Sequence, residues 1–175
     1  MKTSKKIVAM AVSLMMCSVA LVAAEKRASP PTQASAVIAG KKITIDYGAP
    51  SRRARKIMGG LVPFGKVWRT GANEATTLKT EGDLTFGKVL VPKGTYTIYT
   101  IPGQKEWTLI LNKQNGQWGT EYDQKQDLGR VVMSVSPMKA AMETFVIAIE
   151  PGKGKSGVLR MKWENTEAAV SFSVR

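Results

Sequence analysis

The residues best able to do chemistry lie within seven positions of each other. They supply a flat aromatic ring, a forked cation, a hydroxyl, an amide and a carboxylate, from Trp68, Arg69, Thr70, Asn73 and Glu74. Aromatic faces suit sugar rings, and a guanidinium group holds a carboxylate through two parallel hydrogen bonds. The segment therefore predicts a binding site for a carbohydrate or another small polar ligand.

The same residues also fit a purely structural role. Arg69 would then pair with Glu74 or with a buried carbonyl, Trp68 would fill the core, and the side chain of Asn73 would cap the loop. If Arg69 and Glu74 form a buried ion pair, removing one partner leaves an uncompensated charge and strongly destabilises the fold. If they face an open pocket, the same substitutions affect ligand binding instead.

A carbohydrate-active hydrolase is a further alternative. Glycosidases use two carboxyl groups about 5 to 10 Å apart. Glu74 is the strongest candidate for one of them, and its potential partners are Asp46, Glu121, Asp123 and Asp127. Because the sequence gives no distance between them, we predict no catalytic residue and expect a non-enzymatic binding or structural module.

Most familiar catalytic and cofactor sites are excluded by composition. The chain has no histidine, and its single cysteine is Cys17, so Ser-His-Asp triads, Cys-His nucleophiles and Cys/His metal sites cannot form within it. Residues 151–156 end in Gly-Lys-Ser like a phosphate-binding loop, but Ile149 stands where that motif needs glycine. We therefore predict a basic hairpin loop there, and we expect no cofactor and no metal.

The chain is strongly basic, with 26 Lys and Arg against 13 Asp and Glu and a formal net charge of +13. These charges are spread along the chain except for one cluster, formed by Arg52, Arg53, Arg55 and Lys56. The cluster lacks the interleaved aromatic residues of a single-strand nucleic-acid binder, so specific nucleic-acid binding is not predicted. It fits a solvated face or a weak contact with anionic lipid or glycan.

The elements that must position these residues are predicted to be strands. From about Ala34 onward, apolar and polar residues alternate with the period of a half-buried strand, and glycine or proline turns separate the runs. The clearest runs are residues 43–47, 95–101, 107–111, 145–149, 159–163 and 170–174. The pattern predicts an all-β domain over 34–175, an antiparallel sandwich or jelly roll of about nine or ten short strands.

Three segments depart from this alternation. Residues 25–33 are a polar, proline-containing linker, residues 50–58 could form a helical turn, and residues 137–142 interrupt the strand pattern. Residues 59–76 (GGLVPFGKVWRTGANEAT) contain four glycines among large polar and aromatic residues, which predicts a structured loop.

The loop sequence, together with residues 89–103 and 106–113, resembles the bacterial family of domain of unknown function 2911. The resemblance extends from about Ile43 to Trp163, and Met58 stands where an aromatic residue is more often expected. It implies an exported bacterial β-rich domain, and it supplies no activity, cofactor or catalytic residue to transfer to this chain.

The amino terminus has the layout of a secretory signal peptide. Lys2, Lys5 and Lys6 precede an apolar stretch from Ile7 to Ala24 that ends in small residues. We predict cleavage after Ala24, which would lower the formal charge from +13 to +10 and remove the only cysteine. The leading hypothesis is therefore a non-enzymatic module of the periplasm or cell surface; an uncleaved membrane anchor is the alternative.

Overall fold

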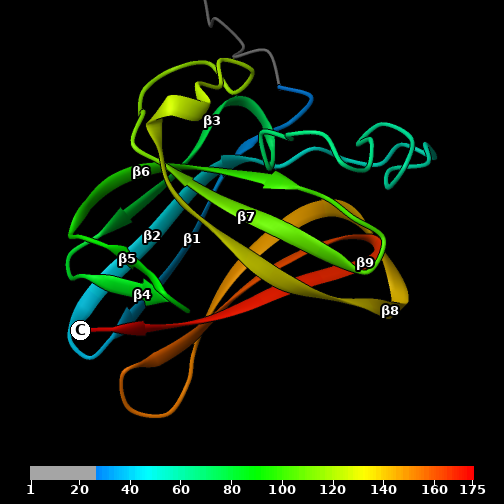
Figure 1. Cartoon of the computed structure of the whole chain (residues 1–175). Helices are drawn as coiled ribbons and strands as arrows, with labels where there is room; N and C mark the ends of the chain where they lie inside the picture. Colours follow the sequence, from blue (N-terminus) through cyan, green and yellow to red (C-terminus); the bar gives the residue numbers. More distant parts are fainter. Residues whose placement is uncertain (1–26) are drawn as a thin grey trace, which may run out of the picture.

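The computed structural model describes residues 27–175, which form nine antiparallel strands and one short 3₁₀ helix (Figure 1). The elements are β1 (Pro31–Ile38), β2 (Lys41–Gly48), β3 (Ala72–Thr80), β4 (Leu84–Phe86), β5 (Val89–Val91), β6 (Gly94–Ile101), β7 (Glu106–Asn112), η1 (Gln124–Gln126), β8 (Asp127–Pro151) and β9 (Ser156–Val174). All strands belong to a single sheet in the order β1-β2-β3-β6-β7-β8-β9-β4-β5. The predicted all-β, antiparallel class is confirmed.

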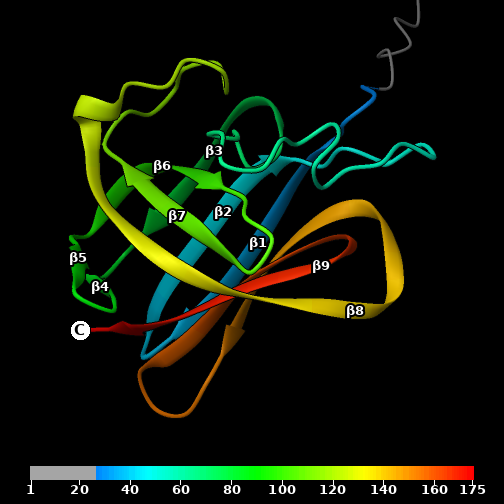
Figure 2. The same ribbon diagram turned by 45° about the vertical axis from the view of Figure 1, so that its right-hand side comes forward.

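Two long strands shape the sheet. β8 has 25 residues and β9 has 19, and their pairing shifts register between Pro137 and Met142 and again between Met142 and Val146. Proline cannot donate a backbone hydrogen bond to the ladder, so it tends to occur at bulges and strand edges. Figures 1 and 2 show β8 and β9 bending across the molecule, so that one sheet covers its own inner face and the core lies between its two parts.

The strand prediction needs three corrections. The runs at 159–163 and 170–174 belong to one strand, β9, whose irregular point is Glu164 with φ of 52°. The expected helical turn at 50–58 is wrong, because those residues form turns and isolated bridges. β1 begins at Pro31, so the last three residues of the expected linker are part of the sheet. The expected interruption at 137–142 is confirmed as the register shift in β8.

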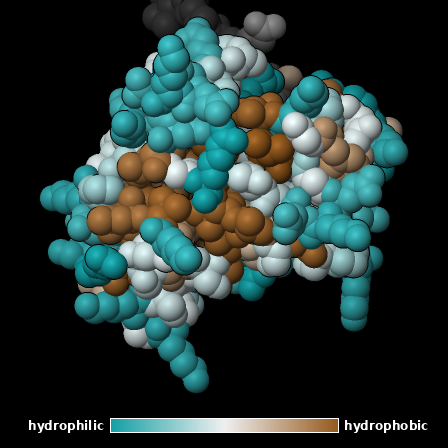
Figure 3. Space-filling model, viewed as in Figure 1, coloured by the Kyte–Doolittle hydropathy of each residue, from teal (hydrophilic) through white to brown (hydrophobic). Residues whose placement is uncertain are grey.

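The core follows from the alternation along the strands. Inward-facing residues of most strands and of the loop after β2 form one buried cluster, which includes Trp107, Phe145 and Trp163. Figure 3 shows that apolar side chains also reach the surface in a band across the face viewed in Figure 1. Leu90 and Val132 are exposed at 43% and 59%. Within residues 27–175, no helix is long and apolar enough to cross a membrane.

We predict that Gly48→Ala lowers the melting temperature, because a Cβ at Gly48 would lie 2.2 Å from the backbone oxygen of Ala72 in β3. Such overpacking lowers the free energy of unfolding by about 1 to 3 kcal/mol. Each kcal/mol lowers the melting temperature by about 2 to 4 °C in a protein of this size. The matched control is Gly94→Ala in β6, where the nearest atom would lie 3.4 Å away. Thermal unfolding followed by circular dichroism tests the pair, and equal losses would contradict the prediction.

Candidate functional site

The loop between β2 and β3, residues 49–71, lies over one end of the sheet (Figure 1). Its first part is tied to β8, since Phe145 N–H donates to Pro50 O at 2.9 Å and Arg52 N–H donates to Glu143 O at 2.7 Å. Its last part is tied to β6 by two backbone hydrogen bonds between Trp68 and Thr100. The glycine-rich segment is therefore a fixed loop, as its composition predicts.

A carboxylate from β9 holds the middle of this loop. Glu164 accepts hydrogen bonds from the backbone N–H groups of Ile57 and Met58, at 3.3 and 3.1 Å. These bonds place Ile57, which is wholly buried, in the core. Glu164 thus satisfies two backbone donors that no strand pairs.

Trp68 joins the loop to the core through a cluster of aromatic rings. It stacks on Trp163 with ring centroids 5.8 Å apart and an interplanar angle of 17°. Its ring also meets Trp107 and Phe145 edge to face, at 6.1 and 5.0 Å. Trp68 is only half-buried, so one part of it packs against the core and another part faces outward.

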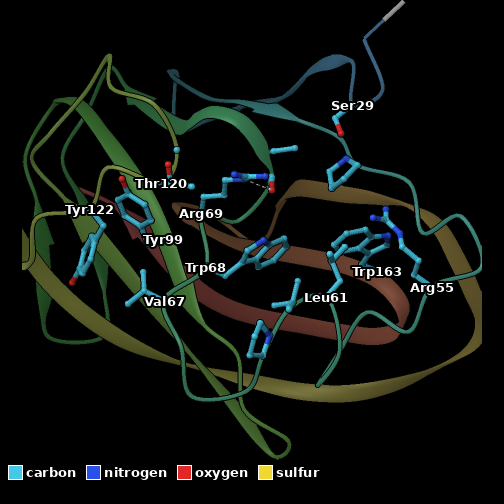
Figure 4. Close-up of a pocket in the computed structure, with 16 residues that line it drawn as sticks. Ser29, Arg55, Leu61, Val67, Trp68, Arg69, Tyr99, Thr120, Tyr122 and Trp163 are labelled. Carbon is cyan, nitrogen blue, oxygen red and sulfur yellow. Dashed lines mark hydrogen bonds between the residues drawn. The ribbon is translucent and has the colours of Figure 1, made fainter.

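The outward part of Trp68 lies in an open cleft of about 680 Å³ (Figure 4). Trp68 and Trp163 form its floor, and the loop contributes Leu61 and Val67, which are exposed at 47% and 40%. In Figure 4, Tyr99 and Tyr122 lie on the same side of Trp68 as Val67, and Leu61 lies on the other side. The cleft thus combines an aromatic floor with an apolar rim.

The two tyrosines are structural walls rather than reactive groups. Tyr99 donates to Glu121 O and accepts from the Gln117 amide, and Tyr122 donates to Asp127 and accepts from Arg130. Burial raises the pKa of Tyr99, and burial together with the Asp127 hydrogen bond raises the pKa of Tyr122. Both phenols are therefore neutral at neutral pH, with their hydroxyl groups already engaged.

Arg69 also lines the cleft, and its only hydrogen bond within residues 27–175 runs from Nε to Gly71 O at 3.3 Å. Its aliphatic stem passes over Gly119: a Cβ there would lie 2.8 Å from Arg69 Cδ and 2.7 Å from Asn73 O. Gly119 is itself anchored, because its N–H donates to Asn73 O at 3.0 Å. A glycine at 119 therefore leaves room for the Arg69 side chain.

The other three predicted site residues lie outside this cleft. Thr70 is fully buried and donates to Trp68 O, while Asn73 donates to Ser29 O of the amino-terminal segment. Thr70 and Asn73 both have positive φ, 54° and 63°, so the chain turns sharply between the loop and β3. Asn73 thus ties the loop to a distant segment instead of capping it locally.

Of the two partners expected for Arg69 in a structural role, the buried carbonyl is present as Gly71 O, and the pair with Glu74 does not form. Glu74 pairs with Arg27 at 2.8 Å, and both side chains are more than half exposed. Its own backbone N–H and the Arg27 guanidinium hold the pKa of Glu74 below its ordinary value. Glu74 lines a second hollow of about 550 Å³ together with Asp46, which pairs with Lys79 at 3.2 Å.

The basic cluster divides between two environments. Arg53 and Lys56 are exposed, and Arg52 is half-buried. Arg55 is exposed on the rim of the cleft, held by hydrogen bonds to Arg52 O and Ser51 O. Among the described residues, none of the four has a carboxylate partner within 4 Å.

Sequence reasoning found Trp68 and Arg69 but missed most of the cleft lining. Leu61 and Val67 lie in the glycine-rich segment 59–76, but the sequence does not show that their side chains are exposed. Trp163 was expected only as a core residue, and nothing in the sequence connected Gly119 or Tyr122 to the loop. No group of three or more potential metal-ligating residues occurs in the part of the chain that the structure describes.

The sequence of this chain matches one known protein family over most of its length. The model of the family described as protein of unknown function (DUF2911) matches residues 29–172. The chain belongs to this family. The DUF2911 match begins before β1 and ends within β9, so it includes the loop and the cleft. No curated protein and no solved structure matches significantly.

We predict that Glu164→Ala destabilises the protein by about 2 kcal/mol, because two backbone N–H groups lose their acceptor. Glu81→Ala is the control, since the exposed Glu81 accepts a backbone hydrogen bond from Lys42 at 3.0 Å that water can replace. Urea unfolding at neutral pH measures both variants. Equal effects would show that Glu164 does not hold the loop.

Proposed function

We propose that this protein is an exported, non-enzymatic binding module whose cleft takes a small ligand with a flat or apolar face. The observation that carries the proposal is the half-buried Trp68 at the floor of an open cleft with exposed Leu61 and Val67 at its rim. Covering apolar surface is favourable by about 25 cal/mol per Å². A volume of about 680 Å³ is in the range of small-molecule sites.

The chemistry of the cleft favours binding over hydrolysis. None of the described side chains that line it is a carboxylate, whereas glycosidases act through a pair of them. Glu74 and Asp46 share the second hollow, but the lowered pKa of Glu74 does not suit a general acid, and Asp46 is already paired with Lys79. Hydrolysis of chromogenic glycosides that is lost in Glu74→Gln would support the hydrolase instead.

We predict saturable binding of the neutral fluorescent probe N-phenyl-1-naphthylamine in the cleft. Leu61→Ser should weaken it at least about fivefold, because it removes apolar contact area at the rim. Leu90→Ser is the matched control, since Leu90 on β5 is exposed to a similar extent, 43% against 47%, and lies outside the cleft. Probe fluorescence gives the dissociation constants; absent binding, or equal effects of the two variants, would overturn the proposal.

Export is the second part of the proposal. It is supported by the lysine-rich start, the apolar stretch to Ala24 and its small-residue end. These residues lie outside those that the structure describes. We expect the intact mass of the exported protein to correspond to a chain that begins at Glu25, whereas a mass that retains residues 1–24 would indicate an anchor.

We further propose that the basic cluster contacts anionic surfaces weakly, because its cations have no carboxylate partners in the described chain. Adsorption to heparin or to anionic vesicles should disappear near physiological salt. Replacing the cluster residues with glutamine should remove most of the adsorption at low salt. The control variant carries the same charge change at Lys41, Lys42, Lys153 and Lys155, which are all exposed. Adsorption that resists high salt would contradict the electrostatic account.

A further inference from the structure

Arg69 gives the cleft a group that recognises negative charge. Figure 4 shows its side chain directed across the cleft above Trp68. Within residues 27–175 it has no carboxylate within 4 Å, and Nε is its only hydrogen-bonding atom. The two terminal amino groups of the guanidinium are therefore available to a ligand.

The rest of the lining does not compensate this charge. Arg55 adds a second cation at the rim, and none of residues 27–175 that line the cleft is acidic. A partly enclosed, apolar surrounding strengthens a charged hydrogen bond, and a guanidinium fork matches the oxygen atoms of a carboxylate, sulfonate or phosphate group. Beside this cation, Trp68, Leu61 and Val67 offer apolar surface.

We infer that the ligand is an amphiphilic anion: an apolar body that covers Trp68 and one anionic group that binds Arg69. This inference rests on the proposed function, because it names the ligand class of the same cleft. It assigns Gly119 a positioning role, since a Cβ there would meet both the Arg69 stem, at 2.8 Å, and the backbone oxygen of Asn73, at 2.7 Å.

The test compares two probes that share a naphthyl-phenylamine body. The anionic probe is 8-anilinonaphthalene-1-sulfonate, and N-phenyl-1-naphthylamine is its neutral counterpart. Arg69→Gln should raise the dissociation constant of the anionic probe at least about tenfold, as expected for the loss of a charge-assisted hydrogen bond. The dissociation constant of the neutral probe should change less than about twofold. Arg69→Lys should restore binding only in part, because it keeps the charge and loses the fork.

The control for overall charge is Arg175→Gln, an exposed arginine that does not line the cleft. At constant ionic strength it should leave both probes unchanged. If it weakens the anionic probe as much as Arg69→Gln does, the basic surface attracts anions generally and the inference is overturned. If Arg69→Gln weakens both probes equally, Arg69 only shapes the cleft, which also overturns it.

Gly119→Ala provides a second variant that alters no charge. It should weaken binding of the anionic probe several-fold by displacing the Arg69 stem together with the neighbouring Asn73 carbonyl, with binding of the neutral probe little affected. An unchanged affinity for the anionic probe would refute the positioning role.

Competition against the anionic probe distinguishes sources of the ligand. Three competitors differ in what the anionic group is attached to. Dodecanoate carries it on an acyl chain, 1-naphthoate carries it on an aromatic body, and inorganic sulfate has no apolar body. Displacement by either organic anion and not by sulfate is expected, whereas displacement by sulfate at equal concentration would indicate a plain anion site. If neither fluorescent probe binds, the proposed function itself is wrong. If both probes bind and Arg69→Gln changes the affinity of neither, only the assignment of an anionic ligand is wrong.

Discussion

The stacking of Trp68 on Trp163 is the interaction on which the candidate site depends. It joins the loop between β2 and β3 to β9, in the centre of the core, and so adds a side-chain contact to the backbone hydrogen bonds that fix the ends of the loop. Edge contacts with Trp107 and Phe145 fix the orientation of the Trp68 ring. Because the ring is held from one side, its other side is presented to the cleft in a defined position. Arg69 follows directly in the chain, so the same contact also places the cation.

The sequence predicted the elements of the fold better than their connections. Alternation identifies residues 43–47 as a strand because they have one buried face and one polar face, whereas residues 107–111 alternate only at their start, since Ile110 on the second face is also buried. It could not reveal that β8 and β9 run through their irregular points, since a bend at Pro137 or Glu164 resembles a strand end in a local pattern. Sheet order depends on distant pairing, for which alternation carries no information.

The sequence predicted the part of the candidate site that lies within one loop and missed the part that comes from distant segments. Trp68 and Arg69 stood out because an aromatic residue and an arginine adjoin within a glycine-rich loop. The pairing of Arg69 with Glu74 was wrong because Thr70 and Asn73 adopt positive φ and turn the chain between them. Glu74 then meets Arg27, which is 47 positions away. Trp163, Tyr122 and Gly119 come from segments that only the fold brings to this loop.

The pairing of β4 with β9 joins Leu84 to Val174, so the order of synthesis matters for this protein. On an emerging chain, β4 and β5 can pair with each other, but they join the rest of the sheet only through β9. Trp163, the ring on which Trp68 stacks, also arrives late. Sheets built from such non-local pairs fold slowly. The nascent chain therefore cannot complete its core before β9 has been made, so the strands that form first must wait for a partner that lies far along the chain.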